Sequence, residues 1–70
     1  RVNAVAPGAV ATNMLKKVAD ETVAAWKKKS ALGRLTEARE IGSTVLFLLS
    51  DLSSGITGET ITVSCGLSFR

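Results

Sequence analysis

Two strand-like segments lie near opposite ends of this chain, and the long stretch between them carries helical patterns. The first segment, residues 2–6, is a short apolar run that Pro7-Gly8 ends abruptly, because proline has no amide hydrogen for a β-ladder. The second segment, residues 59–64, alternates more apolar with more polar residues, most of them β-branched. Strands joined by a helical crossover pair in parallel. The sequence therefore predicts an α/β fold built around one β-α-β unit.

The strongest helical pattern covers residues 37–50, and we expect Thr36 to be its N-cap. Leu46 and Phe47 widen the apolar arc, so this helix is expected to be buried on more than one side. Gly42 costs about 1 kcal/mol relative to alanine inside a helix, which indicates close packing against another backbone. The apolar positions that share one face of a 3.6-residue period are Ile41, Val45, Leu48, Leu49 and Leu52.

The stretch between the first strand and this helix, residues 7–30, combines a loop with a second helical region. We expect one short helical turn within residues 13–19, then a helix that has Asp20 as its N-cap and ends near Lys29. Trp26 lies on this second helix. Two interpretations of Trp26 stay open, simple packing and the wall of a substrate pocket.

The length of 70 residues allows one small domain of marginal stability. Small folds usually depend on disulfides, a metal or a partner. Cys65 is the only cysteine and the chain has no histidine, which excludes an internal disulfide and the common zinc patterns. We expect Cys65 to be an inert, packed thiol and no metal to be bound. Support must then come from more polypeptide, and the strand that begins at Val2 without an initiator methionine leads us to expect residues upstream.

The net charge is +3, and the densest basic stretch is Lys27-Lys28-Lys29. An anionic partner is one interpretation of these lysines. The favoured one is a solvated helix end, where cations complement the negative end of the dipole. Nucleic-acid sites need a broader basic patch, and no apolar run approaches the ~18 residues of a membrane span. We therefore expect no nucleic-acid or membrane partner and a cytoplasmic location.

Two parts of the sequence resemble the short-chain dehydrogenase/reductase family. Residues 1–12, Arg-Val-Asn-Ala-Val-Ala-Pro-Gly-Ala-Val-Ala-Thr, are similar to the sixth strand of the family and its following loop. Residues 32–34, 47–51 and 56–59, which read Leu-Gly-Arg, Phe-Leu-Leu-Ser-Asp and Ile-Thr-Gly-Glu, resemble the last helix and strand. The resemblance implies that residues 1–70 are the C-terminal β-α-β portion of one doubly wound, parallel, Rossmann-like sheet. The family ending Val-Asp-Gly-Gly is replaced by Val63-Ser64-Cys65-Gly66.

The resemblance also implies a cofactor loop at the carboxyl end of the first strand, where open parallel sheets bind ligands. Its cofactor-binding residues would be Pro7, Gly8, Val10 and Thr12. Val10 would offer its backbone to the nicotinamide carboxamide of NAD or NADP, and Thr12 would offer its hydroxyl to the cofactor. Glycine would let the backbone approach the flat ring. Without the resemblance, the favoured interpretation of Pro7-Gly8 is a simple turn and that of Thr12 a local cap; the full segment reverses this preference.

Catalytic residues are not expected in residues 1–70. The family uses a tyrosine whose pKa is lowered by a lysine four positions on, with help from a serine, and this chain has no tyrosine. Its six glycines do not form a phosphate-binding turn, and a Ser-His-Asp triad lacks its histidine. The implied function is therefore part of an oxidoreductase that transfers hydride between a nicotinamide cofactor and a small carbonyl or alcohol. The alternative is a non-catalytic segment for association, since members of this family commonly form homo-oligomers.

Overall fold

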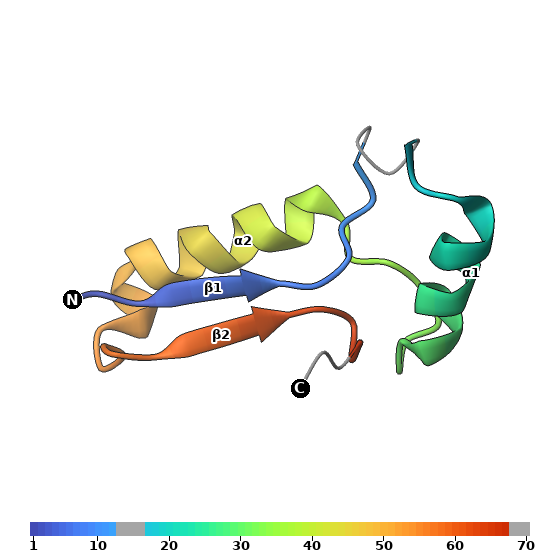
Figure 1. The fold of residues 1–70 in the computed structure, drawn as a ribbon. Helices are drawn as coiled ribbons and strands as arrows, with labels where there is room; N and C mark the ends of the chain where they lie inside the picture. Colours follow the sequence, from blue (N-terminus) through green and yellow to red (C-terminus); the bar gives the residue numbers. More distant parts are fainter. Residues whose placement is uncertain (13–16, 68–70) are drawn as a thin grey trace.

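The structure is a computed structural model that describes residues 1–12 and 17–67. Along these residues lie strand β1 (Ala4–Pro7), helix α1 (Asp20–Lys29), helix α2 (Ala38–Leu49), the short 3-10 helix η2 (Asp51–Ser53) and strand β2 (Thr60–Val63) (Figure 1). The two strands form a parallel sheet in which Ala4 is opposite Thr60 and Pro7 is opposite Val63. The predicted parallel β-α-β unit is confirmed. Of the helical turn expected within residues 13–19, residues 13–16 lie outside the described part of the chain.

The first strand is shifted relative to the predicted residues 2–6, because pairing with β2 continues through Pro7. The N–H of Ala4 donates to the carbonyl of Glu59 at 2.8 Å, and the N–H of Gly8 donates to that of Val63 at 3.0 Å. Successive residues of a strand direct their N–H groups to opposite edges. The missing N–H of Pro7 would thus face away from β2, so the ladder loses no bond to β2. The second strand is one residue shorter at each end than predicted.

The N-caps of both helices differ from the predicted ones. Helix α2 has Glu37 as its N-cap, and the Glu37 N–H donates to Oε1 of Glu40 at 2.9 Å, as in a capping box. Thr36 does not cap the helix, because its hydroxyl is directed toward the end of β2. Helix α1 has Ala19 as its N-cap, and Asp20 is instead its first residue, where a carboxylate still complements the helix dipole.

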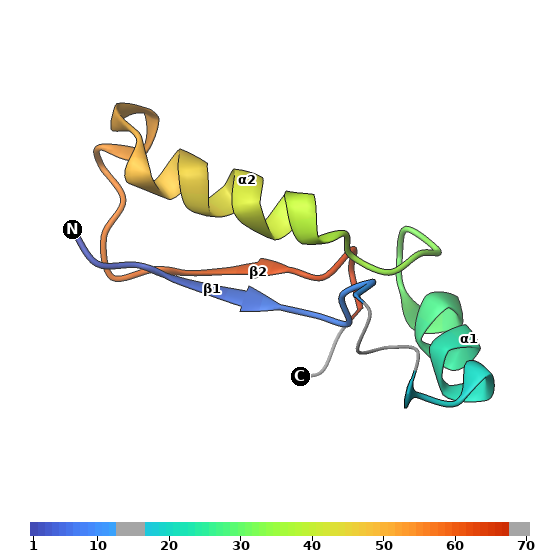
Figure 2. The same cartoon turned by 90° about the horizontal axis from the view of Figure 1, so that it is seen from above.

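Helix α2 lies along one face of the sheet, and no described element covers the other face (Figure 2). Within the described residues the buried apolar side chains are Leu35, Leu48 and Leu67. Leu46 and Leu49 are 70% and 78% exposed, so the expected burial of α2 on more than one side is not found here. The space beside Gly42 is open, so the predicted close packing of another backbone against Gly42 is wrong for the described residues. None of the helices described has the length and apolar character to cross a membrane.

The C-terminal end of α2 is held by the side chain of Arg1. Helix α2 has no basic residue in its last turn, and Arg1 supplies the cation that complements this end of the dipole. The guanidinium donates to the backbone carbonyls of Ser53 at 2.8 Å, Ile56 at 3.0 Å, and Leu48 and Ser50 at 3.2 Å. Next to it, the Asn3 side chain donates to the carbonyl of Ile56 at 3.1 Å and accepts from the N–H of Glu59 at 3.0 Å. These contacts fix the loop that leads into β2.

Candidate functional site

The segment that follows β1 is hydrogen-bonded to Thr36, which lies shortly before α2. The N–H of Thr36 donates to the carbonyl of Ala9 at 3.1 Å, and the N–H of Ala11 donates to the carbonyl of Thr36 at 2.8 Å. Val10 therefore lies opposite Thr36 in an isolated parallel bridge. The loop is thus an extended segment with its own partner.

These two bonds decide where the backbone groups of Val10 point. In an extended segment the N–H and C=O of one residue point to one side, and those of its neighbours point to the other. The groups of Ala9 and Ala11 face Thr36, so both groups of Val10 face away from it. Among the described residues, neither group of Val10 has a hydrogen-bond partner. Val10 consequently presents one donor and one acceptor side by side.

Gly8 brings this loop against the end of β2. A Cβ atom at Gly8 would lie 2.6 Å from the Cβ of Ser64 and 3.0 Å from its Cα, closer than real Cβ contacts. Any side chain at this position would push the two strand ends apart. The approach of Gly8 to Ser64 is a packing requirement that the sequence alone did not reveal.

All four residues predicted for the cofactor site lie on this one stretch of chain. Pro7 ends β1, Gly8 and Val10 are half-buried, and Thr12 is exposed. Within the part of the chain that the structure describes, the Thr12 hydroxyl has no hydrogen-bond partner. Among the described residues, the stretch therefore combines a close backbone approach with a donor–acceptor pair and a hydroxyl that have no partner.

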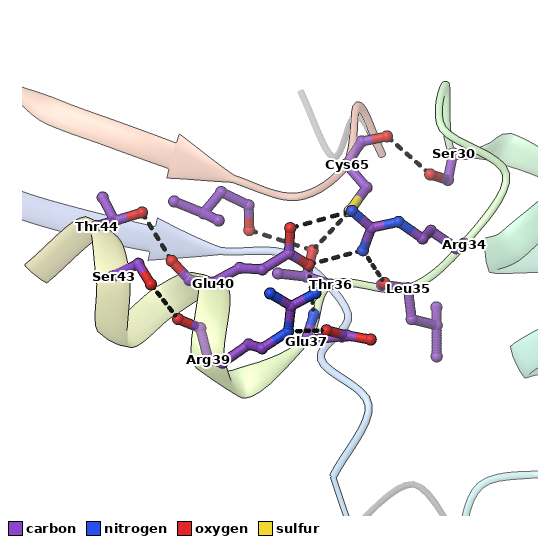
Figure 3. A network of polar contacts seen from close by, with 11 residues as sticks. Ser30, Arg34, Leu35, Thr36, Glu37, Arg39, Glu40, Ser43, Thr44 and Cys65 are labelled. Carbon is purple, nitrogen blue, oxygen red and sulfur yellow. Dashed lines mark hydrogen bonds and ion pairs between the residues drawn. The ribbon is translucent and has the colours of Figure 1, made fainter.

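A polar network surrounds Thr36 (Figure 3). Arg34 and Glu40 form a bidentate ion pair with Nη1–Oε1 at 2.7 Å and Nη2–Oε2 at 3.1 Å. The hydrogen bonds from Arg34 and, to a lesser extent, from the Glu37 backbone lower the pKa of Glu40 from 4.5 to about 2. The bond to Glu40 in turn raises the pKa of Arg34 above its ordinary value. Both side chains remain charged over the whole physiological range, on the two sides of Thr36.

The chain reverses after β2 in a tight turn that places Cys65 in a left-handed conformation. The N–H of Leu67 donates to the carbonyl of Ser64 at 3.0 Å, and Cys65 and Gly66 have φ values of 54° and 80°. Positive φ at both central residues is the signature of a type I′ turn, which favours Gly, Asn and Asp. The position of Cys65 corresponds to the first glycine of the family ending noted above. The replacement of this family glycine by Cys65 therefore indicated, already in the sequence, a residue with unusual backbone geometry.

The Cys65 turn also contacts the segment before α2. The Cys65 carbonyl accepts from the Ser30 hydroxyl at 2.8 Å and from the N–H of Leu32 at 3.0 Å. The Cys65 thiol is half-buried, with its Sγ 3.6 Å from Oγ1 of Thr36. Among the described residues, no cluster of His, Cys, Asp and Glu is arranged to hold a metal ion.

Helix α1 stands apart from the sheet and has no buried residue (Figure 1). Lys27, Lys28 and Lys29 are exposed in its last turn, as both the solvated helix end and the anionic partner require, so both interpretations stay predictions. Trp26 is half-buried on the same helix, so both interpretations of this tryptophan stay predictions.

Comparison with known proteins gives matches over nearly the whole chain. A family model described as Enoyl-(Acyl carrier protein) reductase matches residues 1–68. The 3-oxoacyl-[acyl-carrier-protein] reductase of Aquifex aeolicus is 44% identical over 66 residues, and that of Salmonella typhimurium is 46% identical over 66 residues. Each alignment covers 94% of this chain and 27% of the relative. The chain thus spans about a quarter of the length of these relatives.

Solved structures agree with the sequence matches. A 3-oxoacyl-[acyl-carrier protein] reductase from Brucella melitensis superposes with a TM-score of 0.94 at 41% identity, over 100% of this chain and 26% of that one. A short-chain dehydrogenase/reductase from the same organism, described as a glucose/ribitol dehydrogenase, superposes with a TM-score of 0.90 at 36% identity, over 100% of this chain and 29% of that one. The β-α-β geometry and these matches together show that the chain belongs to the short-chain dehydrogenase/reductase family.

Proposed function

We propose that residues 1–70 form the C-terminal part of a nicotinamide-dependent reductase, in which residues 7–12 bind the nicotinamide end of NAD or NADP. The activity of the whole domain would be hydride transfer between this cofactor and a carbonyl or alcohol. The names of the relatives favour a 3-oxoacyl group on an acyl carrier protein as the substrate. No tyrosine occurs in residues 1–70, so the proton donor of the family would lie in another part of such a domain.

The observation that carries the proposal is the free donor–acceptor pair of Val10. A primary carboxamide has an acceptor oxygen and an N–H donor on the same carbon, so it can bond to both groups at once. Two neutral hydrogen bonds of this kind contribute roughly 1–3 kcal/mol together. The bridge to Thr36 holds both groups in place before any ligand arrives, which reduces the entropy lost on binding.

The other residues of the loop would orient the cofactor. Gly8 keeps the loop close to the end of β2, and the exposed hydroxyl of Thr12 is available to donate to a polar atom of the cofactor. The cofactor, when bound, supplies the hydride. The role of residues 1–70 is therefore to hold the nicotinamide ring in one orientation at the carboxyl edge of the sheet, where parallel sheets bind ligands.

A second proposal is association with further polypeptide, including a second copy in a homo-oligomer. Its support is the exposure of three apolar side chains in α2 and η2, Leu46, Leu49 and Leu52, which are 70%, 78% and 84% exposed. Apolar side chains that gather on a surface mark places that other polypeptide covers, and these three lie within residues 46–52. This proposal is compatible with the first, because a cofactor loop and an association surface lie at different parts of the fold.

The cofactor proposal can be tested in a hybrid reductase, in which residues 1–70 replace the matching quarter of the Aquifex aeolicus relative. Calorimetry would measure the affinity for NADH and NADPH, and for ADP-ribose and its 2′-phosphate, which lack the nicotinamide. Val10→Pro removes the Val10 N–H and should weaken only the dinucleotides, by about two- to tenfold. Val10→Ala keeps both backbone groups and should change neither affinity.

Three results would overturn the proposal. The first is a folded hybrid that prefers neither dinucleotide over its nicotinamide-free counterpart. The second is an equal loss of affinity for both kinds of ligand in Val10→Pro. The third is a hybrid that does not fold, since a segment of the same family should complete the sheet.

A further inference from the structure

We propose that Thr36 is a positioning residue for the nicotinamide carboxamide, because it holds the Val10 segment against both β2 and α2. This inference rests on the proposed function. Thr36 would not touch the cofactor, and would act through the backbone of its neighbours in space. Its role would be to set the direction of the free N–H and C=O of Val10.

The first line of support is the complete use of the polar groups of Thr36 inside the protein. Thr36 is fully buried, with 0% of its surface exposed. Its N–H and C=O bond to Ala9 and Ala11, as described above. Its hydroxyl donates to the carbonyl of Val63 at 3.4 Å and lies 3.6 Å from the sulfur of Cys65. One residue thereby joins the loop, the end of β2 and the start of α2.

The second line of support is the shared acceptor at the end of β2. The carbonyl of Val63 accepts from the N–H of Gly8 at 3.0 Å and from the hydroxyl of Thr36 at 3.4 Å. A carbonyl oxygen has two lone pairs and can accept both bonds. Gly8, at the beginning of the loop, and Thr36, which bridges to its later part, thus both bond to the same carbonyl oxygen of β2. A change in the Thr36 hydroxyl bond would shift the bridge relative to Gly8.

The third line of support is the way in which the chain around Thr36 is fixed. Nη1 of Arg34 donates to the carbonyl of Leu35 at 3.2 Å as well as to Glu40. The same Oε1 atom of Glu40 accepts from the N–H of Glu37. The ion pair therefore clamps the residue before Thr36 and the residue after it. A support held on both sides can keep two backbone groups directed at a ligand.

The side chain of Thr36 allows a mild and specific perturbation. Thr36→Val keeps the branched shape and removes the hydroxyl, and the carbonyl of Val63 still accepts from Gly8, so no buried group loses its last partner. Thr36→Ser keeps the hydroxyl and removes the methyl group. Thr44→Val is a matched control, because the Thr44 hydroxyl donates to the Glu40 carbonyl at 2.8 Å on α2, away from the loop.

The experiment uses the hybrid reductase and the same two kinds of ligand. In Thr36→Val the affinity for the preferred dinucleotide should fall by about two- to tenfold, the range for one neutral hydrogen bond, while that for its nicotinamide-free counterpart stays unchanged. Amide hydrogen exchange at Ala11, whose N–H bonds to Thr36, should become faster. Thr36→Ser and Thr44→Val should bind both ligands as the unmodified hybrid does.

The outcomes separate this inference from the proposed function. Equal loss for both ligands would mean a merely structural role for Thr36, and no loss would mean no role; either result overturns the inference alone. An unmodified hybrid without preference for a dinucleotide overturns the proposed function itself. If circular dichroism shows that Thr36→Val unfolds, Thr36→Cys replaces it, because a thiol fills the site and donates only weakly.

Discussion

Arg34 and Glu40 face each other across the turn into α2 with two parallel contacts of 2.7 and 3.1 Å. The residues between them include the buried Leu35 and Thr36. A bidentate pair of this kind fixes orientation as well as distance, because the guanidinium plane matches the carboxylate. The consequence is a rigid entry into α2, on which the Val10 segment depends through its bridge to Thr36.

Acid should loosen this entry. The pKa of Glu40 is lowered from 4.5 to about 2, so the stability that its carboxylate contributes is fully present above the unfolded value and is lost as the pH falls from 4.5 toward 2. The effect should be small, because both side chains are partly exposed and screened by solvent. The urea midpoint of the unmodified hybrid should be higher than that of the Glu40→Gln hybrid at pH 4.5. The difference between the two midpoints should shrink as the pH falls toward 2. A difference between the two midpoints that stays constant with pH would contradict the prediction.

Cys65→Gly should stabilise the turn after β2. The left-handed conformation costs a residue with a Cβ roughly 1–2 kcal/mol, whereas glycine adopts it freely. After the extra entropy of unfolded glycine is subtracted, a net gain of about 1 kcal/mol is expected. The urea midpoint should rise with an unchanged m-value.

Cys65→Ala is the control for the loss of the thiol, since alanine keeps the strain and lacks the contact with Thr36. It should be no more stable than the unmodified protein. A lower midpoint for Cys65→Gly than for Cys65→Ala would show that the thiol contact outweighs the backbone strain.

Gly8→Ala should destabilise the end of the sheet by roughly 1–3 kcal/mol, the usual range for overpacking. The reason is steric, because the new Cβ would lie 2.6 Å from the Cβ of Ser64. Ser64→Gly removes that atom, so the double variant should lose less stability than the sum of the two single variants. A double-mutant cycle of unfolding free energies measures this coupling. Additive losses would mean that the clash with Ser64 is relieved in another way.

Thr12→Val should weaken binding of the nicotinamide cofactor, because the hydroxyl is lost while the shape is kept. The expected loss is roughly 0.5–1.5 kcal/mol, the net contribution of one neutral hydrogen bond. Calorimetric titration of the hybrid measures it. Thr22→Val on α1 is the control, since that exposed threonine lies on an element away from the loop. Unchanged affinity and turnover in Thr12→Val would remove this residue from the proposed site.

The local patterns of the sequence were sufficient for the main elements of the fold. The Pro7-Gly8 stop and the alternation in residues 59–64 located both strands, and helical periodicity located α2. The predicted apolar face of α2 holds only in part. Leu48 is buried, whereas Leu49, which is still inside α2, is 78% exposed, and Leu52 lies beyond the helix end in η2 and is 84% exposed. A repeat of 3.6 residues holds only while the helix continues.

The features missed by the sequence depend on long-range partners. Thr36 looked like an N-cap, but its partners are a loop and a strand end far away in the chain, and Glu37 takes the cap with help from Glu40. The loop residues of the candidate site came from the resemblance. The structure adds the reason why the N–H and C=O of Val10 have no partner among the described residues. No local pattern contains this reason, since it depends on the bridge to Thr36.

The hydrogen bonds that Arg1 makes at the C-terminal end of α2 affect the order of folding during synthesis. Arg1 bonds to residues about fifty positions later, and Asn3 bonds to Glu59 at a separation of 56 residues. The entropy of closing such a loop must be lost before any of these contacts forms, which slows folding of topologies with distant partners. While a ribosome produces this segment, β1 lacks its partner β2 until residues 60–63 emerge. The edge of β1 that later pairs with β2 would keep its backbone N–H and C=O groups unpaired during that interval, when aggregation or chaperone binding competes with folding.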